Sequence, residues 1–246
     1  MCERGPHVGA LTFDDDLPHV EVVAPILRRA NLPAAFFLCG ASLDRPQPFW
    51  RHDLQAVVDQ RGASSSRLRS LPELDLTPAI RRVPHAAHEI AEHIERMPPE
   101  RWSTVAEELR SHAGKPRRAL SARGVDGLSA AGFEIGFHTR RHDLLSTLDD
   151  NALSAAMTYG HDLLEAAVGR ALTMIAYPHG KADGRAAGAA RAAGYELGLT
   201  GSPTRVDPTT DPLLIGRVEV QALTVRDFAA ALGAILAAED RKPARA

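Results

Sequence analysis

The sequence predicts an α/β protein with a parallel, barrel-type sheet and a helical insertion between its second and third strands. Short apolar runs alternate with helix-like stretches over residues 7–43 and again over residues 125–238. Residues 44–124 contain helix-like stretches but no convincing strand. The 246 residues suit one barrel-sized domain, or a domain with a substantial insertion. We therefore expect residues 1–43 and 125–246 to form the barrel.

The first strand–helix–strand unit lies at the start of the chain. HVGALTF (7–13) predicts a buried strand, and AAFFLCG (34–40) predicts the second. HVEVVAPILRRAN (19–31) predicts the helix between them. Its core-facing residues are expected to be Val22, Val23, Ile26 and Leu27. This order of elements favours parallel pairing through a right-handed crossover.

The same alternation resumes after residue 124. The strands expected there are FEIGFH (133–138), LTMIAYP (172–178), YELGLT (195–200) and LLIGRVEV (213–220). Helices are expected over residues 147–169, 184–194 and 224–238. The first of these helices has Thr147 as its expected N-cap and Gly169 as its stop, and the last is capped by Thr224.

Composition and charge exclude several classes of protein. The formal net charge is -2 and no block of one sign is long, so neither a nucleic acid nor an anionic membrane is expected as partner. A membrane span would need about 18 consecutive apolar residues, and the sequence has no such run. The two cysteines, Cys2 and Cys39, form neither a disulfide framework nor a CxxC pair. With no signal-peptide pattern at the start, we expect a cytoplasmic protein.

Polar clusters follow three of the predicted strands. Asp14, Asp15 and Asp16 end the first strand, HTRRH (138–142) follows FEIGF, and His179 follows LTMIAYP. The carboxyl ends of parallel barrel strands meet on one face, so these side chains should converge at one mouth. The insertion leaves the second strand at the same face and is therefore expected beside this mouth.

The converging residues suit a metal site. His138 and His142 lie four residues apart, and with one carboxylate they provide three protein ligands and leave positions open, as in a catalytic zinc site. The cation would offset the repulsion between adjacent aspartates, and a second carboxylate could act as a base. Alternative readings are a helix N-cap for an aspartate at a strand end, a turn or cap role for Asp16, and a loop position for His179 in which only the backbone is functional.

The sequence resembles the polysaccharide deacetylases of carbohydrate esterase family 4. LTFDDD is similar to that family's Thr-Phe-Asp-Asp-Gly motif, HTRRH to its His-Ser/Thr-x-x-His motif, and AYPHG to a variant of its Arg-x-Pro-Tyr-Gly motif. The resemblance covers residues 7–43 and 125–238. It implies a distorted (β/α)7 barrel and a divalent metal, usually zinc. It also implies attack of a metal-activated water on an acetamide carbonyl, with release of acetate.

The resemblance also implies roles for individual residues. The implied metal ligands are Asp15, His138 and His142, the implied catalytic base is Asp14, and the backbone N–H of His179 is the implied oxyanion donor. Three positions depart from the family pattern: the motif-one glycine is Asp16, the motif-three arginine is Ala176, and the motif-three tyrosine is His179.

The family's late histidine, which acts as general acid, is missing from LLIGRVEV. His179 is the candidate to replace it, and Arg217 is the candidate to replace the arginine that orients the base. We expect Arg217 to contact Asp14 with nitrogen and oxygen about 2.7–2.9 Å apart. The alternative is that Arg217 pairs with Glu219 or another surface acid.

These observations predict a metal-dependent hydrolase that removes an N-acetyl group from an amino sugar or a glycan precursor. One alternative is an amidohydrolase acting on an acylated molecule that is not a sugar. The other is a catalytically silent barrel that binds a sugar or a partner protein.

Overall fold

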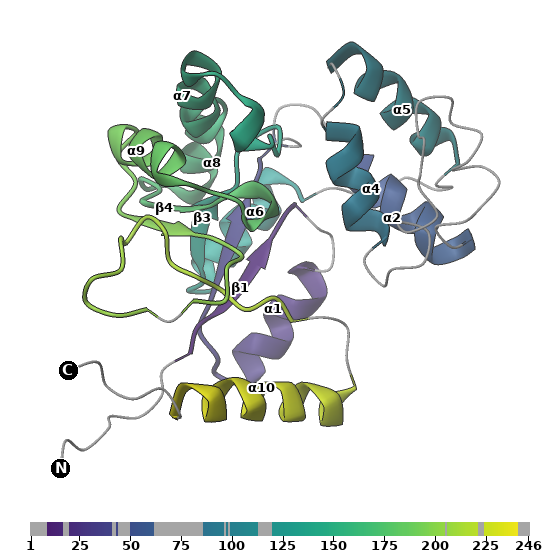
Figure 1. Ribbon diagram of the computed structural model, residues 1–246. Coiled ribbons are helices and arrows are strands. Elements are labelled where there is room, and N and C mark those ends of the chain that lie inside the picture. The colour runs from purple at the N-terminus through teal and green to yellow at the C-terminus, as the bar shows by residue number, and fades with distance from the viewer. Residues whose placement is uncertain are drawn as a thin grey trace.

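A computed structural model of the chain describes residues 9–16, 20–40, 43, 50–61, 86–95, 97, 99–112, 120–204, 206–220 and 224–240. Its centre is a parallel sheet that curls into part of a barrel (Figure 1). The sheet is made of five strands, and their order in space is their order in the chain. They are β1 (Leu11–Asp14), β2 (Ala34–Leu38), β3 (Glu134–Phe137), β4 (Met174–Ala176) and β5 (Leu197–Leu199). The predicted fold class is confirmed.

The strand register brings bulky apolar residues side by side across the sheet. Phe13 pairs with Phe36 of β2, which pairs with Ile135 of β3. Phe36 and Phe37 are fully buried although they point to opposite faces of β2. A parallel sheet is covered on both faces, so its strands can be apolar throughout.

Helices surround the sheet and are connected to it in chain order (Figure 1). They are α1 (Val20–Arg29), α2 (Trp50–Arg61), α4 (Ala86–Glu95), α5 (Pro99–His112), α6 (Ala122–Ala130), α7 (Asp150–Thr158), α8 (His161–Val168), α9 (Gly184–Ala192) and α10 (Val225–Asp240). Two short 3₁₀ turns, η2 (Leu145–Thr147) and η3 (Pro178–Gly180), connect them. None of the described helices is both long and apolar enough to cross a membrane.

The sheet separates a large core from a small one. The large core packs one face of the sheet against the helices, with Phe36, Ile135 and Leu164 at its centre. The small core on the other face, here called the inner core, contains Phe37 and Ala176 with a few neighbours. The strand ends above these cores carry the predicted polar clusters, so the packing fixes where those clusters lie.

The helices α2, α4 and α5 form a group beside the sheet (Figure 1). They share a separate apolar cluster that includes Trp50, Leu54, Ile90 and Leu109. These described parts of residues 44–124 are helical, as the sequence predicts. Residues 62–85 and 113–119 lie outside the described part, and the division into a barrel and an insertion stays a prediction.

The predicted helix over residues 147–169 is wrong in its extent. Asp149, not Thr147, caps α7, because its Oδ1 accepts the N–H of Ala152 at 2.8 Å. Gly160, with φ of 79°, then separates α7 from α8. The expected stop at Gly169 is confirmed, since this residue is the left-handed C-cap of α8.

Two further expectations need correction. On α1, Val20, Ala24 and Leu27 form the buried stripe, whereas Val22 and Ile26 are 65% and 50% exposed. The spacing i, i+4, i+7 from the first helical residue decides this stripe. The predicted strand over residues 213–220 is reduced to one bridge between Leu199 and Ile215. Beyond Ile215 the segment contacts β1 through the side chain of Arg217, which bonds to Asp14.

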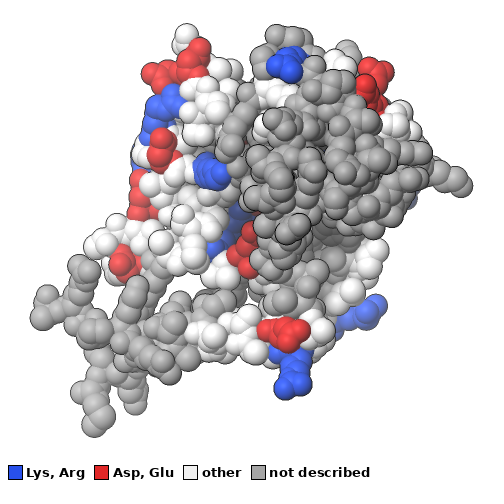
Figure 2. All heavy atoms as spheres, turned by 45° about the vertical axis from the view of Figure 1, so that its right-hand side comes forward, with Lys and Arg blue, Asp and Glu red and all other residues white. Residues whose placement is uncertain are grey.

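Charged side chains of both signs are interspersed over the described part of the face shown in Figure 2. Among the described residues, Arg170 pairs with Glu134 at 2.6 Å and Arg191 pairs with Asp211 at 2.9 Å. These surface pairs are in keeping with the small net charge of the chain.

We predict opposite effects for two glycine-to-alanine changes. A Cβ at Gly136 would lie 2.5 Å from the ring of Phe37, so G136A should destabilise the fold by about 1–3 kcal/mol. A Cβ at Gly127 in α6 would meet nothing within 4 Å, so G127A should stabilise by about 0.5–1 kcal/mol. Urea unfolding of both variants measures the difference. Equal effects of the two changes would contradict the packing described for the inner core.

Candidate metal and active site

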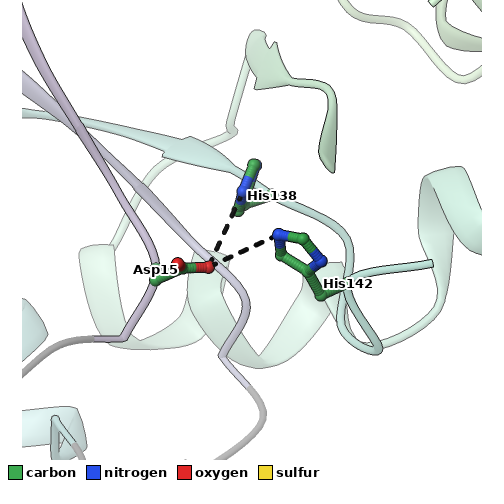
Figure 3. Close-up of side chains that lie close together, drawn as sticks. All are labelled: Asp15, His138 and His142. Atoms are coloured by element: carbon green, nitrogen blue, oxygen red, sulfur yellow. Dashed lines mark ion pairs between the residues drawn. The ribbon is translucent and has the colours of Figure 1, made fainter. Parts of the chain in front are cut away.

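The three predicted metal ligands converge at the carboxyl ends of the strands. Asp15 follows β1, His138 follows β3, and His142 comes from the loop after β3 (Figure 3). Oδ1 of Asp15 lies 3.7 Å from Nε2 of His138 and 3.7 Å from Nε2 of His142. The sequence places these residues far apart, and the parallel sheet brings them together.

These distances fit a metal ion. Ligand atoms bonded at about 2.0–2.2 Å in a tetrahedron lie roughly 3.4 Å from one another. The two distances from Asp15 are close to this value, and all three ligand atoms lie within 4.8 Å of one another. His138 and His142 are almost fully buried, and Asp15 is partly exposed. Nδ1 of His138 lies 2.7 Å from the carbonyl oxygen of Ala176, which accepts its N–H and so turns Nε2 toward the site. The donor set and its orientation therefore suit a divalent cation.

The loops that carry the ligands contain unusual backbone conformations. Asp15, Thr139 and His142 have φ values of 74°, 51° and 54°, in the left-handed region that non-glycine residues seldom adopt. Hydrogen bonds stabilise the second loop: the carbonyl of Thr139 accepts the N–H of His142 at 3.3 Å, and its hydroxyl accepts the N–H of Asp143 at 3.2 Å. Such conformations collect at functional sites, where the surrounding structure holds them.

Asp16 has a structural position in this turn. Asp16 stands at the position of the family's glycine, but in this turn it is Asp15 that has the left-handed conformation. The buried Oδ1 of Asp16 accepts the N–H groups of Cys39 and Gly40 at 2.9 and 3.2 Å. The carboxylate thereby ties the end of β1 to the end of β2, a turn role that confirms the alternative given for this residue.

The thiol of Cys39 lies in this crowded region. Burial raises its pKa well above the ordinary value, and the carboxylates of Asp16 and Asp15 raise it further, while the charge of Arg51 acts in the opposite direction. A thiol in such surroundings stays protonated and behaves as a small apolar residue, in keeping with its place at the end of β2.

Asp14 is held by Arg217. Nη1 of Arg217 lies 2.7 Å from Oδ1 of Asp14, and Nη2 lies 2.7 Å from Oδ2, so the pair is bidentate. Arg217 also donates to Oγ1 of Thr12 at 3.1 Å and to the carbonyl of Thr200 at 3.2 Å. The expected contact with Asp14 is confirmed. It joins β1 to the segment that follows β5.

His179 lies beside the ligands but comes from a different turn. It occupies η3 with φ of 59°, and its ring meets the ring of His142 edge-on, with centroids 4.7 Å apart. The turn is held by Gly201, whose N–H donates to the carbonyl of Gly180 at 2.8 Å. A Cβ on Gly180 would approach the backbone of Gly201 to 2.6 Å, so this contact requires glycine.

A family model described as polysaccharide deacetylase matches residues 3–198. The chain belongs to the polysaccharide deacetylase family. Members of this family are hydrolases that act on the amide bonds of acetylated sugars. No curated protein matches the sequence.

Solved structures of deacetylases share the fold. The deacetylase PplD of Streptococcus pyogenes, solved with acetate, has a TM-score of 0.53 at 14% identity, over 90% of this chain and 68% of that one. BC0361, a polysaccharide deacetylase from Bacillus cereus, has a TM-score of 0.53 at 16% identity, and the match covers 90% of this chain and 50% of that one. IcaB from Ammonifex degensii has a TM-score of 0.53 at 16% identity, and the match covers 91% of this chain and 71% of that one. The chain thus spans between half and about seven-tenths of the length of these structures.

Within the family, this site departs from the motif pattern in a way the structure explains. Ala176 stands where the motif-three arginine is expected, and its methyl group belongs to the inner core while its carbonyl orients His138. Arg217, which lies beyond the matched residues 3–198, contacts Asp14 from another segment. A cation thus lies beside Asp14, but Arg217 provides it in place of the motif-three arginine.

Sequence reasoning missed three contributions to this site. Thr12 and Ala176 lie within the first and third motifs, but the hydrogen bonds that they accept from Arg217 and His138 are not evident from the motifs. Arg51, at the start of α2, reaches the ring of His179 at 3.2 Å and is not part of any motif. The one related expectation is that the insertion, to which Arg51 belongs, lies beside the mouth formed by the strand ends.

We predict that His142→Ala weakens zinc binding by more than about tenfold, because it removes one of three ligands. Zinc retained after dialysis, measured by plasma mass spectrometry, gives the readout. His112→Ala, at the end of α5, serves as the matched control and should retain zinc like the parent. Full zinc retention by the His142 variant would remove this residue from the ligand set.

Proposed function

We propose that this protein is a metal-dependent N-deacetylase that removes an acetyl group from an N-acetylated amino sugar or glycan precursor. One observation carries the proposal: the cluster of Asp15, His138 and His142 lies beside a second carboxylate, Asp14, that is paired with an arginine. Family membership supports the hydrolase class, and the cluster supports dependence on a metal.

Asp15, His138 and His142 are the residues that would hold the ion, for which zinc is our candidate. A zinc ion held there would supply Lewis acidity, which lowers the pKa of a water and polarises the acyl carbonyl. The two imidazoles and one carboxylate leave the ion a net positive charge and an open side. Asp15, the most exposed of the three, marks the side from which substrate would enter.

Asp14 is our candidate for the general base. Its Oδ2 lies 3.9 Å from Nε2 of His138, so the carboxylate faces the ligand cluster. The bidentate contact with Arg217 fixes its orientation. Each oxygen keeps a lone pair beyond the one that Arg217 occupies, so Asp14 can still accept a proton from the attacking water.

His179 is our candidate for two tasks. Its backbone N–H would donate to the oxyanion that forms when water adds to the acyl carbon, a contribution typically of about 2.7–4 kcal/mol. Its ring, edge-on to His142, would give a proton to the departing amine. With this assignment, His179 of motif three takes the general-acid role that the late histidine has in other family members.

Release of acetate tests the proposal. The purified protein would be loaded with zinc and offered N-acetylated amino sugars, short N-acetylated oligosaccharides and N-acetylated amides that are not sugars. Acetate release from the sugars, lost with a chelator and restored by zinc, is expected. Release from the other amides alone would favour an amidohydrolase, and zinc binding without any release would favour a silent barrel.

The cytoplasmic location of the protein stays a prediction.

We predict that Asp14→Asn lowers kcat by about 10²–10⁴-fold, because an amide cannot take the proton. Zinc content should stay at the parent level, since Asp14 is not in the ligand set. Asp150→Asn, on the surface beside Arg185, is the matched control. A rate near that of the parent in the Asp14 variant would mean that another residue is the base.

We predict that Arg217→Lys lowers kcat by roughly tenfold or more without loss of zinc, because an ammonium group cannot reproduce the two parallel hydrogen bonds. Arg191→Lys changes a similar two-oxygen contact with Asp211 on the surface and should leave kcat unchanged. Steady-state kinetics of both variants decides the matter. Equal behaviour of the two would show that the bidentate contact has no part in catalysis.

A further inference from the structure

The helix α2 contacts the site through the guanidinium group of Arg51, which lies against the imidazole ring of His179. Nη2 of Arg51 lies 3.3 Å from Nδ1 and 3.2 Å from Nε2 of His179. We propose that Arg51 is a positioning residue of the active site, which holds the ring of His179 in place and so makes the helix after β2 part of the catalytic machinery. This inference rests on the function proposed above.

The chemistry of the two groups gives the contact a direction. A guanidinium carries only donors, so a ring nitrogen of His179 accepts an N–H of Arg51 only while the ring is neutral. In the protonated ring that proton donation to the amine needs, both nitrogens carry hydrogen and this hydrogen bond is released. The ring of His142 is another neighbour, edge-on to the ring of His179 at an interplanar angle of 77°. The imidazole of His179 is therefore placed between a proposed metal ligand and a cation from a distant segment of the chain.

His179 needs such a support because of its own backbone. It lies in a turn of three residues, with left-handed φ, and its side chain is only partly buried. A small displacement of a catalytic group can lower the rate strongly. A contact from another element can select the rotamer.

The backbone that carries Arg51 is anchored by the neighbouring Trp50. Its neighbour Trp50 is 6% exposed and packs in the apolar cluster of α2, α4 and α5. The guanidinium carbon of Arg51 lies 5.7 Å from the centre of the Trp50 ring, a cation–π distance. The first turn of α2 is thus anchored by one residue, while the next residue reaches the mouth of the site.

The proposal predicts coupling between Arg51 and His179. Arg51→Ala should lower kcat by roughly tenfold with little change in zinc content, since no ligand is touched. Arg51→Lys should restore part of the rate, because it keeps a donor and a charge at the end of a long side chain. In the double variant with His179→Ala, removal of Arg51 should cause no further loss. Arg101→Ala, on α5, removes the same charge from an exposed position as a control.

A second readout does not depend on activity. Nitrogen-15 resonances of the His179 ring, assigned by comparison with His179→Ala, should shift in Arg51→Ala, shift less in Arg51→Lys and stay unchanged in Arg101→Ala. Unchanged resonances in Arg51→Ala would overturn the proposal, and so would additive losses of rate in the double variant. If no acetylated compound is hydrolysed by the parent, the proposed function fails, while the resonances still decide whether Arg51 holds the ring. Should Arg51→Ala not fold, Arg51→Lys and Arg51→Gln provide the same comparison.

Discussion

The ion pair between Arg217 and Asp14 connects the two ends of the curled sheet. Among the strands that the structure describes, β1 pairs with β2 alone, and the segment after Ile215 reaches β1 through a side chain. Arg217 contacts the carbonyl of Thr200 and the hydroxyl of Thr12 as well, so it spans the distance that another strand would otherwise fill. The same contact that closes this side of the barrel also fixes the carboxylate proposed as base, which couples the fold to the chemistry.

The three consecutive aspartates are tolerated because each has a different environment. Asp14 faces Arg217, Asp15 faces the two histidines, and Asp16 accepts backbone N–H groups from the end of β2. Like charges in sequence repel, but cations and donors arranged around them offset that repulsion. Because strand ends of a parallel sheet converge, these separate partners can all be supplied at one place by distant segments.

The sequence predicts much of this arrangement, since period and motif are local properties. The strand–helix alternation and the convergence of Asp15, His138 and His142 follow from it, as does the reach of Arg217 to Asp14. Other features depend on tertiary contacts that no local pattern encodes. Asp15 is the left-handed residue of its turn, beside the buried Asp16 that accepts backbone N–H groups just after β2. Arg51 reaches His179 from α2, far from it in the sequence.

The central claim is that one metal ion is held by Asp15, His138 and His142 with Asp14 beside it and not bound to it. Anomalous diffraction at the zinc edge from zinc-loaded crystals tests this claim most directly. We expect a single strong peak about 2.0–2.2 Å from one oxygen of Asp15 and from both imidazoles, with Arg217 still paired to Asp14. No peak at this position, or a peak bonded to Asp14 with Arg217 displaced, would rule out this metal site.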